Sequence, residues 1–128
     1  MNVIKVPIAF QDERGEIIDV LKEGHVEYAT VIRSKKHAIR GNHYHKDTYQ
    51  HLYVLEGKLR AVSQMPGEQP VEAVLVANDL IVNVPHERHA FEALEDTVFL
   101  VLTRGPRGGE NYEKDTYRLD MPLIAPRS

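Results

Sequence analysis

Two histidines stand close together in a stretch of sequence that is typical of a β-strand. His43 and His45 are separated by Tyr44 alone, and alternate side chains of a strand project from the same face. Both imidazoles can therefore meet at one point, where they would bind a divalent metal ion or act as an acid and a base near neutral pH. On this pair alone, two polar residues on an exposed sheet face are an equally good interpretation.

Two further residues can join the pair. Gln50 opens the next expected strand after a short turn, and His89 begins a later strand shortly after Pro85. On spacing alone, the amide of Gln50 and the imidazole of His89 could therefore face the same point as the pair. Histidines that act as acid and base without a metal remain the competing interpretation.

The elements that must position these residues are short apolar runs separated by turn-forming residues. No window of a dozen residues shows the helical period of about 3.6. We expect strands at residues 2–10, 16–19, 27–33, 38–45, 50–55, 59–64, 71–76, 80–84, 89–93 and 97–103. Strands of this number in a chain of 128 residues predict an all-β sandwich or barrel.

The spacing of the histidines resembles the two conserved motifs of the cupin superfamily. In that superfamily the first motif has two histidines, an acidic residue and a glycine, and the second has a proline before a third histidine. Here His43, His45 and His89 match the three histidine ligands of cupin metal sites, and Gln50 stands at the usual acidic position, so the resemblance implies a metal-binding set of these four residues. Because an amide oxygen is a weaker ligand than a carboxylate, this set would hold the ion less tightly. Asn78 replaces a glycine of the second motif.

The resemblance implies a double-stranded β-helix, or cupin, barrel of two facing antiparallel sheets. We expect a single cupin domain over residues 1–128, with its core motifs at about 38–103. Residues 104–128 should form a C-terminal tail that wraps the outside of the barrel. The glycine-rich start of this tail is interpreted as a plain loop in preference to a lid.

Two stretches are similar to cupins that remodel nucleotide-linked sugars. One is Asp-Glu-Arg-Gly at 12–15, and the other is Arg-Gly-Asn-His-Tyr-His at 40–45. Related stretches occur in the 3,4-ketoisomerases and 3,5-epimerases of deoxysugar synthesis and in zinc-binding cupin domains of capsular-polysaccharide reductases. The resemblance implies an isomerase or epimerase that acts on a nucleotide-linked keto-sugar in surface-polysaccharide biosynthesis.

Such a reaction needs a base, a proton donor and a group that stabilises an oxyanion. We expect His45 or His43 as the base, and Tyr44, Tyr53 or Tyr112 as the donor. The implied cofactor is a divalent metal ion (Zn, Fe, Mn or Ni), which would stabilise the oxyanion.

Basic residues near the motif are candidates for binding the diphosphate of a sugar nucleotide. We expect Arg40, Arg33 and Lys35 to take this role, since an arginine can hold a phosphate through two hydrogen bonds. For each of them, a solvated strand face is the competing interpretation. Two other functions also remain open: an iron-dependent dioxygenase of a small molecule, and a cupin that binds a small ligand without chemistry.

Charge and composition limit the partners. Sixteen Lys and Arg against nineteen Asp and Glu give a net charge of -3, without the basic excess of nucleic-acid-binding proteins. No apolar run approaches the ~20 residues of a membrane-spanning helix, no signal peptide is recognised, and cysteine is absent. We therefore expect a cytoplasmic protein with a small-molecule substrate and with neither nucleic acid nor membrane as a partner.

Two expected strands are apolar on both faces, at residues 98–102 and 74–76. A half-exposed strand alternates apolar with polar residues, so something should cover the outer face of these strands. The chain's own ends would serve, as would a second copy related by two-fold symmetry. We expect a homodimer.

Overall fold

The structure, a computed structural model, describes residues 1–105 and 114–126 of the chain. All the elements that we name in these residues are strands, which agrees with the predicted all-β class. In chain order they are β1 (Ile4–Lys5), β2 (Phe10–Asp12), β3 (Gly15–Ile17), β4 (Tyr28–Ser34), β5 (Ile39–Tyr44), β6 (Tyr49–Glu56), β7 (Lys58–Gln64), β8 (Val71–Val76), β9 (Asp79–Asn83), β10 (Arg88–Ala93), β11 (Thr97–Arg104) and β12 (Tyr117–Arg118).

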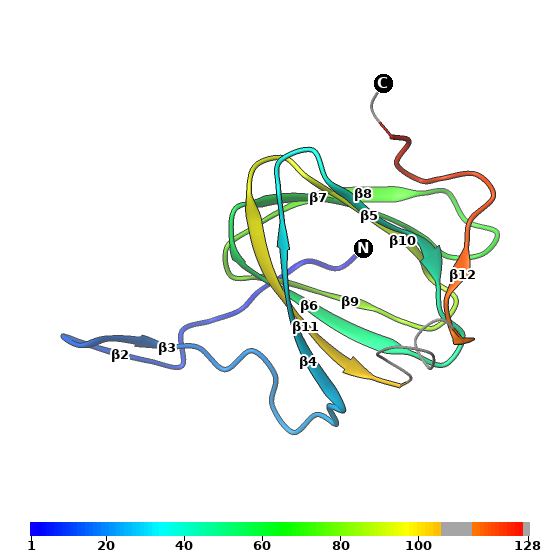
Figure 1. Ribbon diagram of the computed structural model, residues 1–128. Helices are drawn as coiled ribbons and strands as arrows, with labels where there is room; N and C mark the ends of the chain where they lie inside the picture. Colours follow the sequence, from blue (N-terminus) through cyan, green and yellow to red (C-terminus); the bar gives the residue numbers. More distant parts are fainter. Residues whose placement is uncertain (106–113, 127–128) are drawn as a thin grey trace.

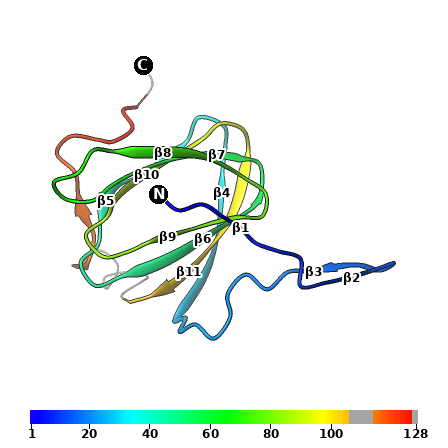
Figure 2. The same cartoon turned by 180° about the vertical axis from the view of Figure 1, so that it is seen from behind.

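Two five-stranded sheets face each other and form the barrel (Figures 1 and 2). The first sheet has the order β1-β9-β6-β11-β4, and the second has the order β12-β5-β10-β7-β8. The strand pairings in both sheets are antiparallel. The cupin barrel of two facing antiparallel sheets, which the resemblance implied, is therefore confirmed.

Apolar side chains from the two inner faces fill the barrel. In β11, Phe99 and Val101 are buried, whereas Leu100 and Leu102 are half-buried, because alternate residues of a strand point to opposite faces. The main cluster of buried residues is Leu52, Val54, Leu59, Ala61, Leu75, Ile81, Phe91, Phe99 and Val101. These residues occupy the space between the sheets next to the candidate site.

The outer face of the first sheet is covered only in part. Val6 packs there on Tyr53 and Leu80, so the N-terminal segment supplies some of the cover predicted from the two-sided apolar strands. Val31 and Leu55, on β4 and β6, remain exposed. Within the described residues, the chain's own ends therefore leave an apolar area on this face.

The N-terminal hairpin stands away from the barrel. β2 pairs with β3, and this two-stranded ribbon, which we call the arm, projects from the body in both views (Figures 1 and 2). Phe10 and Ile17 on the arm are exposed. The single strand expected at residues 2–10 is instead β1 and the start of β2, with Pro7 between them. Proline has no N–H for a sheet ladder, which explains the interruption.

The C-terminal tail contributes more than an outer wrapping. β12 joins the edge of the second sheet, where Tyr117 lies opposite Tyr44, and Ile124 packs on the outer face of that sheet. The tail thus adds an edge strand that was not among the expected strands, because a two-residue strand carries too little periodicity to be recognised. The predicted glycine-rich loop lies largely in residues 106–113, outside the described residues. No helix of the described segments has the length and apolarity needed to cross a bilayer.

Candidate functional site

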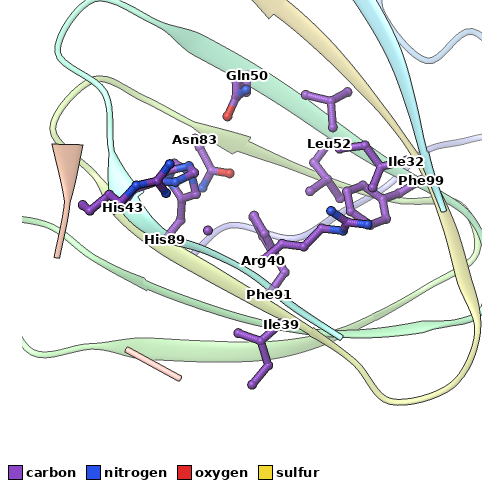
Figure 3. A pocket seen from close by; sticks show the side chains of 13 residues that line it. Ile32, Ile39, Arg40, His43, Gln50, Leu52, Asn83, His89, Phe91 and Phe99 are labelled. Carbon is purple, nitrogen blue, oxygen red and sulfur yellow. The ribbon is translucent and has the colours of Figure 1, made fainter. Parts of the chain in front are cut away.

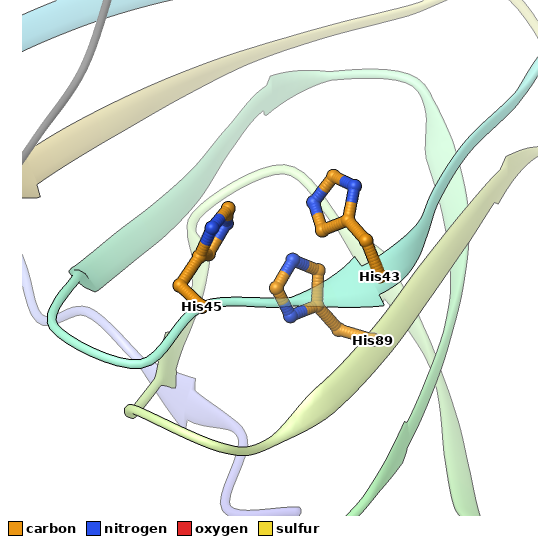
Figure 4. Close-up of side chains that lie close together, drawn as sticks. All are labelled: His43, His45 and His89. Atoms are coloured by element: carbon orange, nitrogen blue, oxygen red, sulfur yellow. The ribbon is translucent and has the colours of Figure 1, made fainter. Parts of the chain in front are cut away.

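Three histidines from two distant parts of the chain meet inside the barrel (Figure 4). The ring centroids are 4.8 Å apart for His43 and His45, 4.7 Å for His43 and His89, and 5.4 Å for His45 and His89. All three residues are buried, and one ring nitrogen of each lies within 4.8 Å of the others. The structure thus brings together the imidazoles that the sequence placed at one point. We call them the histidine cluster.

An irregularity in β5 decides which of its side chains reach the interior. His43 lies opposite His89 of β10, and the register shifts in the next pair, where Gly41 and Asn42 have φ values of 89° and 57°. A bulge of this kind inserts one extra residue and re-aims the side chains beyond it. Arg40 and His43, which regular alternation would put on opposite faces, therefore both line the same cavity.

The C-terminal tail orients His45. The Nδ1 atom of His45 lies 2.8 Å from the backbone oxygen of Asp115. Because a carbonyl oxygen only accepts, Nδ1 carries the proton and Nε2 is left as the basic nitrogen. The Asp115 carboxylate accepts from the N–H groups of Lys46 and Asp47 and from the hydroxyl of Thr48, which fixes the turn after β5. Sequence reasoning missed Asp115, because nothing near it in the chain marks its contact with this turn.

The surroundings of His89 orient its ring and lower its pKa. Its Nδ1 atom lies 3.2 Å from the backbone oxygen of Glu87, which again leaves Nε2 as the basic nitrogen. Burial, and then the neighbouring His43 and His45, lower the pKa of His89 to about 3. His89 is therefore neutral near pH 7, as a metal-binding imidazole must be.

The histidine cluster opens onto a cavity of about 440 Å³ (Figure 3). His43 and His89 line it, whereas His45 is not among its lining residues. The other polar lining side chains are Arg40, Gln50, Asn83 and Arg118, and the apolar ones are Ile32, Ile39, Leu52, Phe91, Phe99 and Val101. The cavity therefore combines imidazole, amide and guanidinium groups with an apolar wall, as ligand sites commonly do.

Gln50 and Asn83 form the amide part of this wall. They are opposite each other on β6 and β9, in the sheet that faces the one carrying His43 and His89 (Figure 3). Asn83 donates its Nδ2 proton to Glu87 at 3.2 Å. The structure thus places Gln50 in the same cavity as the histidine cluster, and its role as a fourth metal ligand stays a prediction.

The expected tyrosine donors do not reach the cluster. The Tyr44 ring stacks on Tyr117 with 5.3 Å between centroids, and the Arg88 guanidinium lies 4.0 Å from the centroid of the Tyr44 ring. Tyr53 belongs to the apolar cluster on the outer face of the first sheet. Alternation along the strands turns both rings away from the cavity, so we withdraw them as proton donors. Tyr112 lies outside the described residues.

Of the three expected basic residues, one lines the cavity and two do not. Arg40 lines the cavity, but Arg33 and Lys35 line a separate hollow beyond the end of β4. In β4 the partly buried Ile32 lines the cavity, so its neighbour Arg33 projects outward. We therefore withdraw Arg33 and Lys35 from the site. Arg118 of β12 lines the cavity instead, and only the pairing of β12 with β5 reveals it.

The donor set of the cluster fits a divalent metal ion. Three imidazoles with one open position are a known arrangement for zinc. Backbone carbonyls hold the Nδ1 protons of His45 and His89, an outer contact that typically fixes metal-binding imidazoles. The same buried imidazoles also suit proton transfer at a cavity wall.

Comparison with known proteins places this geometry in a family. Residues 10–102 match the model of the polysaccharide biosynthesis C-terminal domain. The fold is similar to that of QdtA, a sugar 3,4-ketoisomerase from Thermoanaerobacterium thermosaccharolyticum solved with TDP. The TM-score is 0.77 and the identity 20%, over 93% of this chain and 88% of that one.

Two further structures show the same fold. A dTDP-4-dehydrorhamnose 3,5-epimerase from Sulfolobus tokodaii gives a TM-score of 0.74 at 22% identity, over 89% of this chain and 73% of that one. CapF, solved with an inhibitor, gives 0.66 at 20% identity, over 91% of this chain but 35% of that one. No curated protein matches the sequence significantly. The chain belongs to the polysaccharide biosynthesis C-terminal domain family and has the cupin fold.

Proposed function

We propose that the chain is an isomerase or epimerase that moves a proton next to the carbonyl group of a nucleotide-linked keto-sugar in surface-polysaccharide biosynthesis. One observation carries the proposal. Two of the three clustered histidines line a cavity that is also lined by Arg40 and Arg118. The family of the chain, and the activities of QdtA and of the 3,5-epimerase, support the same chemistry.

We propose His43 as the base, because it lines the cavity and His45 does not. His43 takes the proton from the carbon beside the sugar carbonyl, the C–H electron pair forms the double bond of an enolate, and the carbonyl oxygen takes the negative charge. Delivery of a proton from water to the opposite face of the same carbon, with release of the abstracted proton from His43 to water, is an epimerisation. When that carbon bears a hydroxyl, return of the proton from His43 to the former carbonyl carbon, with transfer of the hydroxyl proton to the oxyanion, moves the carbonyl. Neither route needs an oxidant.

The metal-bound arrangement is the alternative use of the same residues. His43, His45 and His89 would hold a divalent ion (Zn, Fe, Mn or Ni), with Gln50 as the additional predicted ligand. Such an ion supplies Lewis-acid polarisation of a carbonyl. Because His43 cannot be a ligand and a base together, elemental analysis of protein purified without a metal-affinity tag separates the two arrangements. Close to one ion per chain supports the ligand role, and a trace supports the base.

We propose Arg40 and Arg118 as the residues that bind the diphosphate of the substrate. Both line the cavity that holds the histidines. A guanidinium group matches two phosphate oxygens at once and stays charged at every physiological pH.

Deuterium exchange tests the proposed reaction. We expect the protein, incubated in deuterated water with a TDP-linked 4-keto-6-deoxy sugar, to introduce deuterium at a carbon next to the carbonyl. Absence of exchange across a panel of nucleotide-linked keto-sugars would contradict the proposal. Oxygen consumption with a small-molecule substrate would favour the dioxygenase alternative instead.

We also propose that the chain forms a homodimer. The arm exposes Phe10 and Ile17, and Val31 and Leu55 are exposed on the outer face of the first sheet. A second copy would cover both of these apolar surfaces, and a two-fold axis would give the two copies the same contacts. Sedimentation should give a dimer at micromolar concentration and a weaker one after Phe10→Ser. A monomer of the unsubstituted chain would rule the dimer out.

A further inference from the structure

We infer that Ser34 is the positioning residue for Arg40, fixing one edge of the guanidinium group so that the opposite edge is presented to an anionic ligand. The inference deepens the proposed function, since it concerns how the same cavity holds the phosphate group of its ligand. It assigns a role to a residue that contributes no chemistry of its own.

The contact joins the two sheets at one end of the cavity. Arg40 starts from β5 of the second sheet, and its Nε donates to the Ser34 hydroxyl oxygen, at the end of β4 in the first sheet, at 2.7 Å. The Nη2 atom donates to the backbone oxygen of Arg33 at 3.2 Å. Figure 3 shows the Arg40 side chain extended across the cavity toward Ile32 and Phe99. The protein therefore occupies the edge of the guanidinium group that carries Nε and Nη2.

The remaining edge is the part that a ligand can use. A guanidinium group has five N–H donors in a rigid plane, so the bonds to Ser34 and to the backbone oxygen of Arg33 leave three donors on Nη1 and Nη2. This edge matches a pair of oxygens on one phosphate or carboxylate. Because the plane is rigid, fixing the first edge also fixes the direction of the second. A lysine ammonium group has no second edge to orient.

Of the two groups that accept hydrogen bonds from Arg40, only the Ser34 hydroxyl can be removed by a substitution. Arg33 contributes its backbone oxygen, which is present whatever residue stands there. Ser34 is only 5% exposed and its bond to Arg40 is partly buried, so water competes for this bond less than it would at a fully exposed site. Its strand position is fixed by the pairing with Thr97. Loss of the hydroxyl should therefore free the guanidinium group to rotate without removing its charge.

The first test needs no ligand and no activity. In nitrogen-15-labelled full-length protein, we expect a resolved Arg40 Nε–H signal that exchanges slowly with water. Ser34→Ala should lose this signal, and Ser34→Thr should keep it because the hydroxyl is restored. Tyr53→Phe is the matched control, since it removes another largely buried hydroxyl, which donates to Asn78 at 2.6 Å, on the outer face of the first sheet. An Arg40 signal that survives unchanged in Ser34→Ala overturns the inference.

The second test measures binding of inorganic pyrophosphate and of TDP. Since a hydrogen bond to a charged group is lost, Ser34→Ala should weaken TDP binding about 10-fold, with Ser34→Thr within about 2-fold of the parent. Arg40→Lys should weaken binding at least as much, and Ser34→Ala should add little to it, because the two residues act as one unit. Fully additive losses, or equal losses in Tyr53→Phe, overturn the inference. A parent protein that binds neither probe contradicts the phosphate role in the proposed function, while the Nε–H signal still decides the role of Ser34.

Discussion

The histidine end of the barrel and the N-terminal arm each use an aspartate to hold a turn, and burial separates the two. The Asp115 carboxylate accepts three hydrogen bonds, from Lys46, Asp47 and Thr48, and Asp115 is 4% exposed. The Asp12 carboxylate also accepts three, but all come from Arg14, whose side chain is 80% exposed. Polar networks are strong where water is excluded and weak where it competes.

The comparison shows that the two regions differ in what stabilises them. Asp115 fixes the turn after β5, and its backbone oxygen orients His45, so the candidate site is set before any ligand arrives. The arm is a two-stranded ribbon with exposed apolar residues, and such a ribbon is only marginally stable alone. The turn after β5 is stabilised by hydrogen bonds within the barrel, whereas the arm depends for its stability on what packs against it.

The largest expected effect comes from removing the proposed base at the histidine end of the barrel. His43→Ala should lower the rate of solvent-deuterium exchange into the keto-sugar by about 10²–10⁴-fold, because a positioned acid–base group contributes about that much. Tyr44→Phe, on the next residue but the opposite face, should exchange at the parent rate. A His43→Ala protein that exchanges normally would remove His43 as the base.

The next effect compares the two aspartates directly. Asp115→Ala should lower the free energy of unfolding by about 2–4 kcal/mol, because it leaves buried donors of the turn without an acceptor. Asp12→Ala should leave the urea midpoint essentially unchanged, since its partners are exposed to water. Urea unfolding followed by circular dichroism measures both. Equal midpoint shifts would show that burial does not distinguish the two turns.

A third comparison uses two glycines with positive φ. Gly41 has a φ of 89°, and a Cβ atom there would lie 2.8 Å from the backbone oxygen of His89. Gly15 on the arm has a φ of 132°, and a Cβ there meets nothing within 4 Å. Both substitutions to alanine strain the backbone, but only Gly41→Ala also forces apart β5 and β10. We expect thermal unfolding to show a loss of about 2–3 kcal/mol for Gly41→Ala and about 1 kcal/mol for Gly15→Ala. A Gly41→Ala loss no larger than that of Gly15→Ala would show that the close approach of the strands does not matter.

The sequence predicted the barrel and the histidine cluster because both depend on local periodicity and on motif spacing. Alternation along the strand expected at residues 38–45 put His43 and His45 on one face, and the expected strands agree with the observed ones within a few residues over most of the barrel. The same rule applied to Tyr44 would have excluded it as a donor, since a residue between two inward-facing neighbours points outward.

Other parts of the site depend on contacts that alternation does not encode. The bulge at Gly41 turns Arg40 inward, although Arg40 and His43 are an odd number of residues apart. Arg118 and Asp115 reach the site only because the tail folds back on β5. Pairings between distant segments are fixed by the whole fold, and a single sequence without periodicity in its tail does not reveal them.

The smallest expected effect is the pH dependence of the stability that each aspartate contributes. Burial alone would raise the pKa of Asp115, but the hydrogen bonds from Thr48, Lys46 and Asp47 outweigh it and hold the pKa below its ordinary value. A carboxyl group with a lowered pKa in the folded state adds stability above its unfolded pKa of about 3.9, and that stability is lost as the pH falls through the folded value.

The stability gap between the parent protein and Asp115→Asn should therefore be constant from neutral pH down to about 4 and should narrow below it. Urea unfolding at a series of pH values measures the gap. Asp12→Asn is the control, since the hydrogen bonds from Arg14 lower the pKa of Asp12 as well, but at an exposed site. Its gap should stay close to zero throughout, because solvent screens that pair. A gap for Asp115→Asn that is the same at pH 3 and pH 7 would mean that the buried turn does not depend on the charge of its aspartate.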